Sequence, residues 1–319
     1  MTIYLSHESA LRYWLTCDAP SGALAQDGSH SLTYASTNMR DIKRAELPFE
    51  YSPKQKLHVL CNDHNDARNK KAVSAHGWSG PVGAGCFCEY SDLCQISTPE
   101  FTFLQIAAKR PLVNLIEIGT YLCGGFSIEA GQGFKDLRRP VTSISKLESF
   151  LWAMEGTYGV KKAREALRFI TPGTASPMEV NLSLAFSLPP RLGGWGYPEL
   201  QANYAIDIPQ HLRGLLPSRQ LKCDIYFPSV NGDIEFDGAA YHSGAEKLDY
   251  TQTRRNVLEA MGIKTVSATK MQVNKYERFN DFMWMAIEHL GLPMRIYSSK
   301  QTERQRELYE RLFGYHALF

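Results

Sequence analysis

Residues 223–238 read Cys-Asp-Ile-Tyr-Phe-Pro-Ser-Val-Asn-Gly-Asp-Ile-Glu-Phe-Asp-Gly, and this stretch decides the fold of the C-terminal half. Both of its halves are predicted to be short strands. In the second, Asp233, Glu235 and Asp237 alternate with apolar residues, so the three carboxylates share one face. Aligned carboxylates repel one another, and strands disfavour acidic residues. The pattern therefore predicts a positive partner, and a divalent metal ion is the first candidate.

The loop between these two strands determines which acidic side chains meet. If residues 228–231 form a four-residue hairpin loop closed by Phe227 and Gly232, Asp224 lies directly opposite Glu235 on the same face. A slip of one residue would turn Asp224 to the other face. Carboxylates on adjacent strands are hard oxygen ligands, which suit Mg²⁺ or Mn²⁺ better than zinc. Asp224 and Glu235 are therefore the predicted metal ligands.

The surrounding residues predict a mixed α/β domain. A helix begins at Ser176, three strands follow, and a helix over residues 243–261 connects the Glu235 strand to a strand over residues 263–269. By the crossover rule these last two strands lie parallel. The predicted order is helix, three strands, helix, strand in one mixed sheet, followed by C-terminal helices over residues 276–290 and 301–313.

The best break in the chain is Thr171-Pro172-Gly173-Thr174, which combines a helix terminator with small polar residues. We place the domain boundary there, giving domains of residues 1–173 and 174–319. In the first domain, a helix opening at Ser6 precedes short strands over residues 57–61, 72–78 and 85–89, and further helices follow. The N-terminal domain is therefore predicted to be α+β.

Composition narrows the class of protein. The 319 residues carry a formal charge of +2, too mild a value to indicate nucleic-acid binding without a local basic patch. The seven cysteines lack the dense spacing of a secreted disulfide scaffold, so we expect reduced thiols in a cytoplasmic protein. No segment approaches the roughly 18 apolar residues of a membrane span, and no leader pattern opens the chain. Neither export nor membrane insertion is expected.

The ordered motifs resemble a known family. They are Asp224, a short loop, Glu235-Phe236-Asp237-Gly238, Tyr241-His242, and a helix with Arg254-Arg255-Asn256 ahead of the final strand. Over residues 176–270 this order resembles the restriction-endonuclease-like PD-(D/E)XK nuclease domain, and more narrowly the bacterial branch similar to very-short-patch-repair endonucleases. Residues 58–125 are more weakly similar to abortive-infection (AbiEi-type) antitoxins.

The resemblance implies a metal-dependent endonuclease that hydrolyses DNA phosphodiester bonds, in phage defence or DNA repair. It implies metal binding by Asp224 and Glu235, a supporting acid at Glu179 on the preceding helix, and roles for Asp237 and His242 near the scissile phosphate. DNA is the expected partner and Mg²⁺ or Mn²⁺ the expected cofactor. On the helix, Arg254 and Arg255 are candidate contacts to the acids or to phosphate, and the alternative for them is exposed helix charge.

One position departs from the family. The usual lysine two residues after the second acid is replaced by Asp237, so Lys264 on the following strand or His242 would have to supply the cation or the proton transfer. If neither does, DNA binding alone is left. The alternative function is then a non-catalytic, antitoxin-like or regulatory factor that contacts DNA or a toxin partner. A nuclease specific for RNA or branched DNA is a third reading that the sequence does not separate from the first.

Each functional reading has a simpler structural one. The acidic set could be a solvated strand face, and Glu179 fits a capping box with Ser176, which explains it without a metal. The cysteines, including Cys61, Cys86 and Cys88, match no paired zinc spacing, and ordinary buried thiols are the favoured explanation. Three basic groups would track phosphates only if they share one side of the molecule: Arg68/Lys70/Lys71, Lys135/Arg138/Arg139 and Lys161/Lys162/Arg164.

Overall fold

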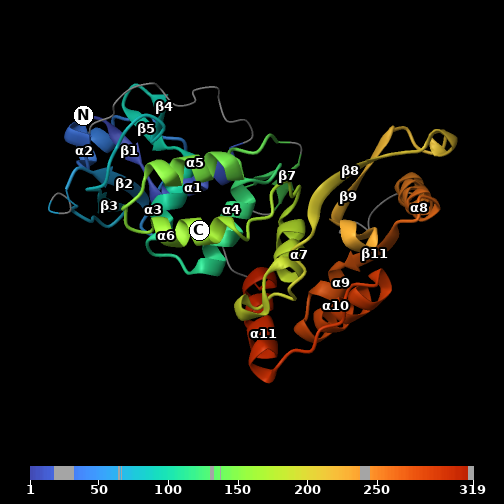
Figure 1. Cartoon of the computed structure of the whole chain (residues 1–319). Helices are drawn as coiled ribbons and strands as arrows, with labels where there is room; N and C mark the ends of the chain where they lie inside the picture. Colours follow the sequence, from blue (N-terminus) through green and yellow to red (C-terminus); the bar gives the residue numbers. More distant parts are fainter. Residues whose placement is uncertain are drawn as a thin grey trace. The chain divides into compact units, whose positions relative to one another are not determined.

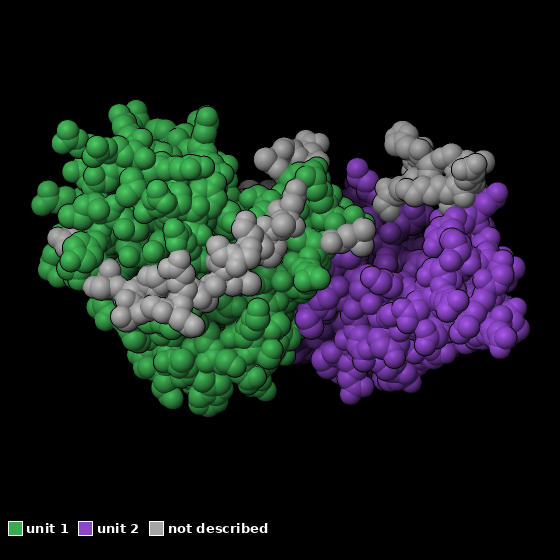
Figure 2. Space-filling model, turned by 90° about the horizontal axis from the view of Figure 1, so that it is seen from above, with its two compact units in different colours: residues 1–170, 319 green, residues 171–318 purple. Residues whose placement is uncertain are grey.

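The computed structural model describes residues 1–17, 32–63, 65, 67–129, 133–136, 138–237 and 245–314. The chain divides into two compact units, Met1–Ile170 and Thr171–Leu318 (Figure 2). The second unit begins within a few residues of the boundary that the Thr-Pro-Gly-Thr break predicts. Each unit has its own sheet and its own core.

The N-terminal unit is built on a five-stranded sheet of order β3-β2-β1-β5-β4 (Figure 1). Its strands are β1 (Ile3–Leu5), β2 (Leu57–Cys61), β3 (Val73–Gly77), β4 (Phe87–Ser91) and β5 (Cys94–Ser97). The pairs β1–β5 and β2–β3 are parallel, whereas β1–β2 and β4–β5 are antiparallel. The sequence did not predict β1 or β5, because three or four residues are too few to show the period of two on which strand prediction rests.

Six described α-helices belong to the same unit as this sheet. They are α1 (His7–Thr16), α2 (Met39–Ile42), α3 (Pro99–Ala107), α4 (Leu112–Leu122), α5 (Ile144–Ala153) and α6 (Val160–Leu167), and a small ribbon pairs β6 (Ser127–Ile128) with β7 (Phe134–Lys135). Thr98 caps α3 by accepting from the Phe101 N–H, with Pro99 at the first helical position, as the sequence predicts. Eight of the nine residues of α3 are buried, so this helix forms the centre of the unit's core.

The C-terminal unit contains the predicted order of elements. It runs α7 (Pro177–Ser187), β8 (Gln201–Asp207), β9 (Gln220–Phe227), β10 (Gly232–Asp237), α8 (Ala245–Ala260) and β11 (Lys264–Thr269). Its sheet has the order β11-β10-β9-β8, in which β8, β9 and β10 are antiparallel neighbours and β11 is parallel to β10. The mixed α/β character predicted for this half is therefore confirmed.

Three helices complete this unit: α9 (Lys270–Val273), α10 (Tyr276–Leu290) and α11 (Ser299–Phe313). Helix α7 contacts β9, α8 contacts β11, and α10 contacts both β10 and β11. The core that holds α8 to the sheet includes Leu221 and Cys223 of β9 and Val257 and Leu258 of α8. Along β9 these buried residues alternate with Lys222 and Asp224, which are less buried.

Candidate active site

The hairpin register is the one that the loop length predicts. Phe227 pairs with Gly232, and Ile225 pairs with Ile234. The turn is a single 3-10 turn over Pro228–Val230, followed by Asn231 with φ of +47°, and the Tyr226 hydroxyl donates to Asn231 Oδ1 at 2.7 Å. Continuing this register by one residue places Asp224 opposite Glu235.

The two acids line one cleft. Its volume is about 510 Å³, and its walls come from β9, β10, β11 and α8. Asp224, Glu235 and Asp237 all line it, together with Arg254 and Arg255. The predicted convergence of the acidic side chains from two neighbouring strands is therefore present.

Carboxylates also join the two strands of the hairpin. Asp224 Oδ2 accepts a hydrogen bond from the Phe236 backbone N–H at 3.0 Å, and Asp233 Oδ1 accepts from the Ile225 N–H at 3.3 Å. Asp233 is fully buried and does not line the cleft, although its position in the alternation suggested the same face as Glu235. Asp233 therefore connects the strands, and Asp224 both connects the strands and faces the cleft.

Helix α8 supplies the positive charge. Arg254 Nη1 donates to Glu235 Oε2 and its Nη2 donates to the backbone carbonyl of Lys222, while Arg255 Nη2 donates to Ser267 Oγ. The Arg254 and Glu235 side chains are only 19% and 14% exposed. A charge pair so weakly hydrated requires good geometry to be stable. Arg254 is thus a built-in counter-ion of the acidic cleft.

Glu179 approaches Asp224 from α7, and it also takes part in the N-terminal cap of that helix. Ser176 caps α7 by accepting from the Glu179 N–H, while the Glu179 carboxylate accepts from the Ser176 hydroxyl at 2.9 Å and from the Ala175 N–H at 2.7 Å. Its Oε2 accepts a third bond, from Asn203 Nδ2 at 2.6 Å. Asn203 lies on β8 between residues paired with Ile225 and Cys223, so it is opposite Asp224. Glu179 is therefore held next to the sheet at the position of Asp224.

Burial is the main influence on the acidic side chains. Burial and, after it, the negative charge of Asp224 raise the pKa of Glu179 to about 7, against the hydrogen bonds from Ala175, Ser176 and Asn203. Burial and the charge of Asp224 likewise raise the pKa of Asp233 to about 7. The pKa of Asp224 is raised by burial, which outweighs the Phe236 N–H and Arg254. These groups sit where a further positive charge would be favoured.

Lys264, the predicted replacement for the missing lysine, does not line the cleft. On β11, Lys264 pairs with Gly232 and Ser267 pairs with Glu235. Lys264 lies three residues before Ser267, and because side chains alternate along a strand, it points to the face of the sheet opposite that of Glu235. It lines a separate hollow with His289, and its ammonium lies near Gly291. The prediction that Lys264 replaces the missing lysine is therefore wrong. His242 lies outside the described residues.

Sequence reasoning missed two residues of the cleft region. Lys222 lies two residues before Asp224 on β9 and lines the cleft, so it is a lysine on the acidic face. Asn203 adopts φ of +50°, a left-handed conformation that asparagine tolerates better than most residues. The spacing Lys222-x-Asp224 was the available signal for the lysine. For Asn203 the sequence carries no signal, because its partner is a side chain on another element.

The donor set fits a small divalent cation. Among the described residues, no group of three or more His, Cys, Asp or Glu side chains is arranged to hold a metal ion. Mg²⁺, however, is commonly held by one or two carboxylates with water at its other positions. Glu235 Oε1 is buried and has no hydrogen-bond partner in the described part of the chain. A lone pair left in this way next to Asp224 is a suitable ligand.

The other polar groups that the sequence singled out serve the structure. Arg138 is buried and donates to the Trp14 and Cys17 carbonyls, and Lys162 donates to the Arg110 carbonyl. Cys88 and Cys94 are buried, and burial raises the pKa of each thiol to about 12. No helix in the described ranges is both long and apolar enough to cross a membrane.

Comparison with known proteins adds no assignment. No protein family, no curated protein and no solved structure matched the chain.

The raised pKa of Glu179 predicts a pH-dependent stability. Below about pH 4.5 both folded and unfolded states hold the proton, whereas between that value and about 7 only the folded state does. The stabilising contribution is thus complete below about pH 4.5 and is lost as the pH rises from there through 7, by about 3 kcal/mol in total. We expect Glu179→Gln to remove this pH dependence of stability. The measurement is denaturant unfolding of wild type and variant at pH 5.5 and 8.5, and an equal pH response in both proteins would contradict it.

Proposed function

We propose that the C-terminal unit is a metal-dependent nuclease that hydrolyses phosphodiester bonds in DNA. The observation that carries the proposal is the pairing of Asp224 with Glu235 across two antiparallel strands, in a cleft that arginines from α8 enter. The helix, three strands, helix and strand around this cleft match the order expected of a PD-(D/E)XK core. Fold alone does not determine activity, so the argument rests on the cleft residues.

In this proposal, Asp224 and Glu235 hold a Mg²⁺ or Mn²⁺ ion between the strands. When bound, such an ion polarises a phosphoryl oxygen and makes a water molecule more acidic. Phe236 fixes the orientation of Asp224 through its N–H, and this hydrogen bond leaves the other carboxylate oxygen for the cation. Asp237 lies at the end of β10 and lines the same cleft, where it would orient water.

Cations for the phosphate come from α8 and β9 in place of the missing lysine. Arg254 and Arg255 present planar guanidinium groups, which match phosphate oxygens better than a lysine does. Lys222 adds a third positive side chain on the Asp224 face of β9. Glu179, with a pKa of about 7, would hold or release a proton near neutral pH beside this group.

The test is a cleavage assay with the full chain. Supercoiled plasmid, linear duplex DNA and single-stranded RNA are incubated with Mg²⁺, Mn²⁺ or a chelator. We expect nicked or linear plasmid with either metal and none with the chelator. Cleavage that persists in the chelator would contradict a metal-dependent reaction, and intact substrate under every condition would contradict nuclease activity.

One observation favours a second candidate function. Arg254 already neutralises Glu235, and a cleft neutralised in this way suits a protein that binds DNA or a toxin partner without cutting. This candidate predicts salt-sensitive DNA binding by a protein that leaves all substrates intact. It also predicts that Asp224→Asn leaves DNA affinity unchanged or raises it, because the substitution removes a negative charge from the binding face.

A further inference from the structure

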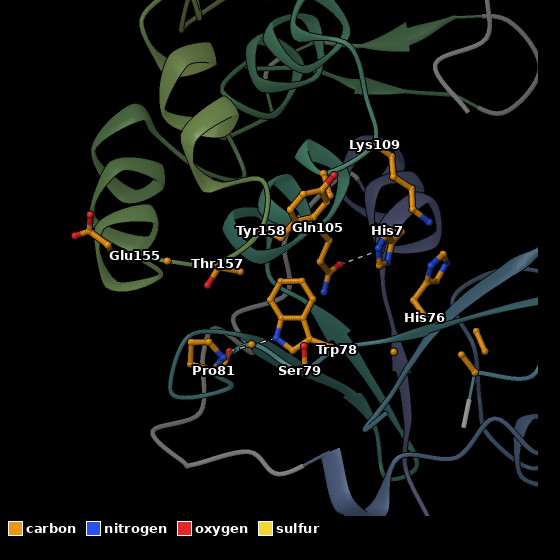
Figure 3. Close-up of a pocket in the computed structure, with 16 residues that line it drawn as sticks. His7, His76, Trp78, Ser79, Pro81, Gln105, Lys109, Glu155, Thr157 and Tyr158 are labelled. Carbon is orange, nitrogen blue, oxygen red and sulfur yellow. Dashed lines mark hydrogen bonds between the residues drawn. The ribbon is translucent and has the colours of Figure 1, made fainter. Parts of the chain in front are cut away.

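The N-terminal unit contains a pocket of its own, with a volume of about 680 Å³. Figure 3 shows it between the end of β3, the turn after α3 and the loop that joins α5 to α6. The polar and aromatic side chains that line it include His7, His76, Trp78, Thr157, Tyr158 and Lys109. Pockets that hold small organic molecules typically enclose about 300–1,000 Å³.

His7 and His76 line one side of this pocket, and His58 contacts His76. His58 Nδ1 lies 2.9 Å from Glu8 Oε2 and 3.0 Å from His76 Nε2. The His76 ring stacks on His7 with centroids 3.8 Å apart and an angle of 18°. His7 has φ of +45°, and its backbone N–H donates to the buried Gln105 Oε1 at 3.0 Å. An unusual backbone conformation held by a buried hydrogen bond fixes His7 at the pocket wall.

The groups facing this wall are one cation, Lys109, and the imidazole rings of His7 and His76, which can donate hydrogen bonds. Burial, helped by the positive charges of His58 and Lys109 and opposed by Glu8, lowers the pKa of His76 to about 4. Burial also holds the pKa of His7 well below its usual range, with His76, His58 and Lys109 acting in the same direction and Glu8 in the other. An anion placed beside His76 would raise the pKa of that imidazole toward its ordinary value.

The acids near the pocket already have partners. Glu8 is bound by His58 and lies 3.3 Å from Arg110, and burial alone would raise its pKa, but the His58 contacts hold that pKa well below its usual range. Glu155 pairs with Arg164 at 3.5 Å, and Figure 3 shows it pointing away from Trp78 and the histidines. Negative charge on a ligand would therefore meet Lys109 and the imidazoles first.

The opposite side of the pocket offers aromatic surface. Tyr158 is 79% exposed and lies between Gly156 and Gly159, which have φ of +81° and +91°. A Cβ at Gly159 would lie 2.9 Å from the Ala108 nitrogen, so only glycine allows this loop to pack against the turn that carries Lys109. Tyr158 is thus held beside Lys109 and above Trp78 (Figure 3). In the same loop, Thr157 Oγ1 is buried and has no hydrogen-bond partner within the described ranges.

We propose that this pocket binds a small anionic ligand that carries a flat ring, with the chemistry and size of a nucleoside monophosphate. Lys109 and His76 contact the phosphate, and Tyr158 and Trp78 contact the ring. The pocket lies wholly within the N-terminal unit, so this site is independent of the acidic cleft and of any nuclease activity.

Calorimetric titration of the full chain tests the proposal. The probes are adenosine 5′-monophosphate, adenosine and inorganic phosphate. We expect the nucleotide to bind about tenfold or more tightly than either fragment, because only the nucleotide uses both sides of the pocket. Nucleotide binding no tighter than that of adenosine would overturn the anionic half of the proposal, and binding no tighter than that of phosphate would overturn the ring half. No binding at millimolar concentration would overturn the whole.

Exposed side chains provide matched variants that leave the core intact. Lys109→Gln is expected to weaken nucleotide binding roughly five- to tenfold and Tyr158→Leu about tenfold, from the loss of a charged hydrogen bond and of stacking. The controls are Lys43→Gln and Tyr34→Leu, exposed residues of the same unit that do not line the pocket. Equal affinities for a pocket variant and its control would overturn the site.

A 5′-phosphorylated oligonucleotide distinguishes a free nucleotide from a strand end. Tighter binding than the mononucleotide, lost in Tyr158→Leu, would support the same chemistry with a strand end as its source. Binding of the oligonucleotide that Tyr158→Leu and Lys109→Gln both leave unchanged would overturn this pocket as the place of contact.

Discussion

Replacing Glu235 with glutamine is expected to reduce metal-dependent DNA cleavage by about a thousandfold or more. The substitution keeps the shape of the side chain and a carbonyl oxygen for Arg254, but it removes the negative charge that would hold the cation. Asp224→Asn is expected to have an effect of the same order, because Asp224 is the second proposed ligand and the acceptor of the Phe236 N–H. The double variant should lose little more than either single variant, since in the proposal both carboxylates would hold one ion.

The measurement is the initial rate of plasmid nicking at several Mg²⁺ concentrations. Asp207→Asn is the matched control, because Asp207 is an exposed acid at the end of β8 that bonds to Gln220 and does not line the cleft. It should cut at the wild-type rate. Undiminished cleavage by Asp224→Asn and Glu235→Gln would show that the reaction occurs elsewhere in the chain.

Removing the Arg254 side chain is expected to destabilise the C-terminal unit by about 3 kcal/mol, because Arg254→Ala leaves Glu235 ionised and poorly hydrated without its partner. Glu235→Gln should restore much of this loss, because the stranded charge is then absent. Mg²⁺ should also raise the unfolding temperature of Arg254→Ala more than that of wild type, since the ion can take the place of the guanidinium. This readout tests the cation site without any measurement of activity.

The matched control is Arg306→Ala. Arg306 contacts Glu277 at 2.8 Å, but the two side chains are 52% and 70% exposed, so the loss should be below about 1 kcal/mol. Denaturant unfolding of each variant with and without Mg²⁺ gives the comparison. If Arg254→Ala is no less stable than Arg306→Ala, the pair does not neutralise the cleft. If Mg²⁺ stabilises both variants and wild type equally, the ion does not bind at Glu235.

The sequence predicted the acidic hairpin because two local rules act on it together. Alternation assigned Glu235 and Asp237 to one face, and the four-residue loop set the register that brings Asp224 opposite Glu235. Helix caps such as Ser176 and Thr98 were also readable, since their partners lie three residues away. Each of these features depends on neighbours along the chain.

The features that the sequence missed depend on elements that are distant along the chain. The face of Lys264 follows from where α8 ends and β11 begins, and a difference of one residue reverses it. Asn203 meets Glu179 only because β8 and α7 pack together. Arg254 was a candidate contact to the acids from its place on the helix, but its pairing with Glu235, nineteen residues away, requires α8 to fold back over the sheet. Such placements are set by tertiary packing and leave no local pattern.

The tethered guanidinium of Arg254 has a consequence for the order in which the cleft is filled. While Arg254 occupies Glu235, a free divalent ion competes with a cation that is part of the chain and cannot diffuse away. A phosphate group offers Arg254 an alternative partner and thereby releases Glu235. In the proposed nuclease, binding of DNA would then favour binding of the metal ion at Glu235. Pre-incubation with DNA should therefore shorten any lag before cleavage, whereas pre-incubation with Mg²⁺ should not.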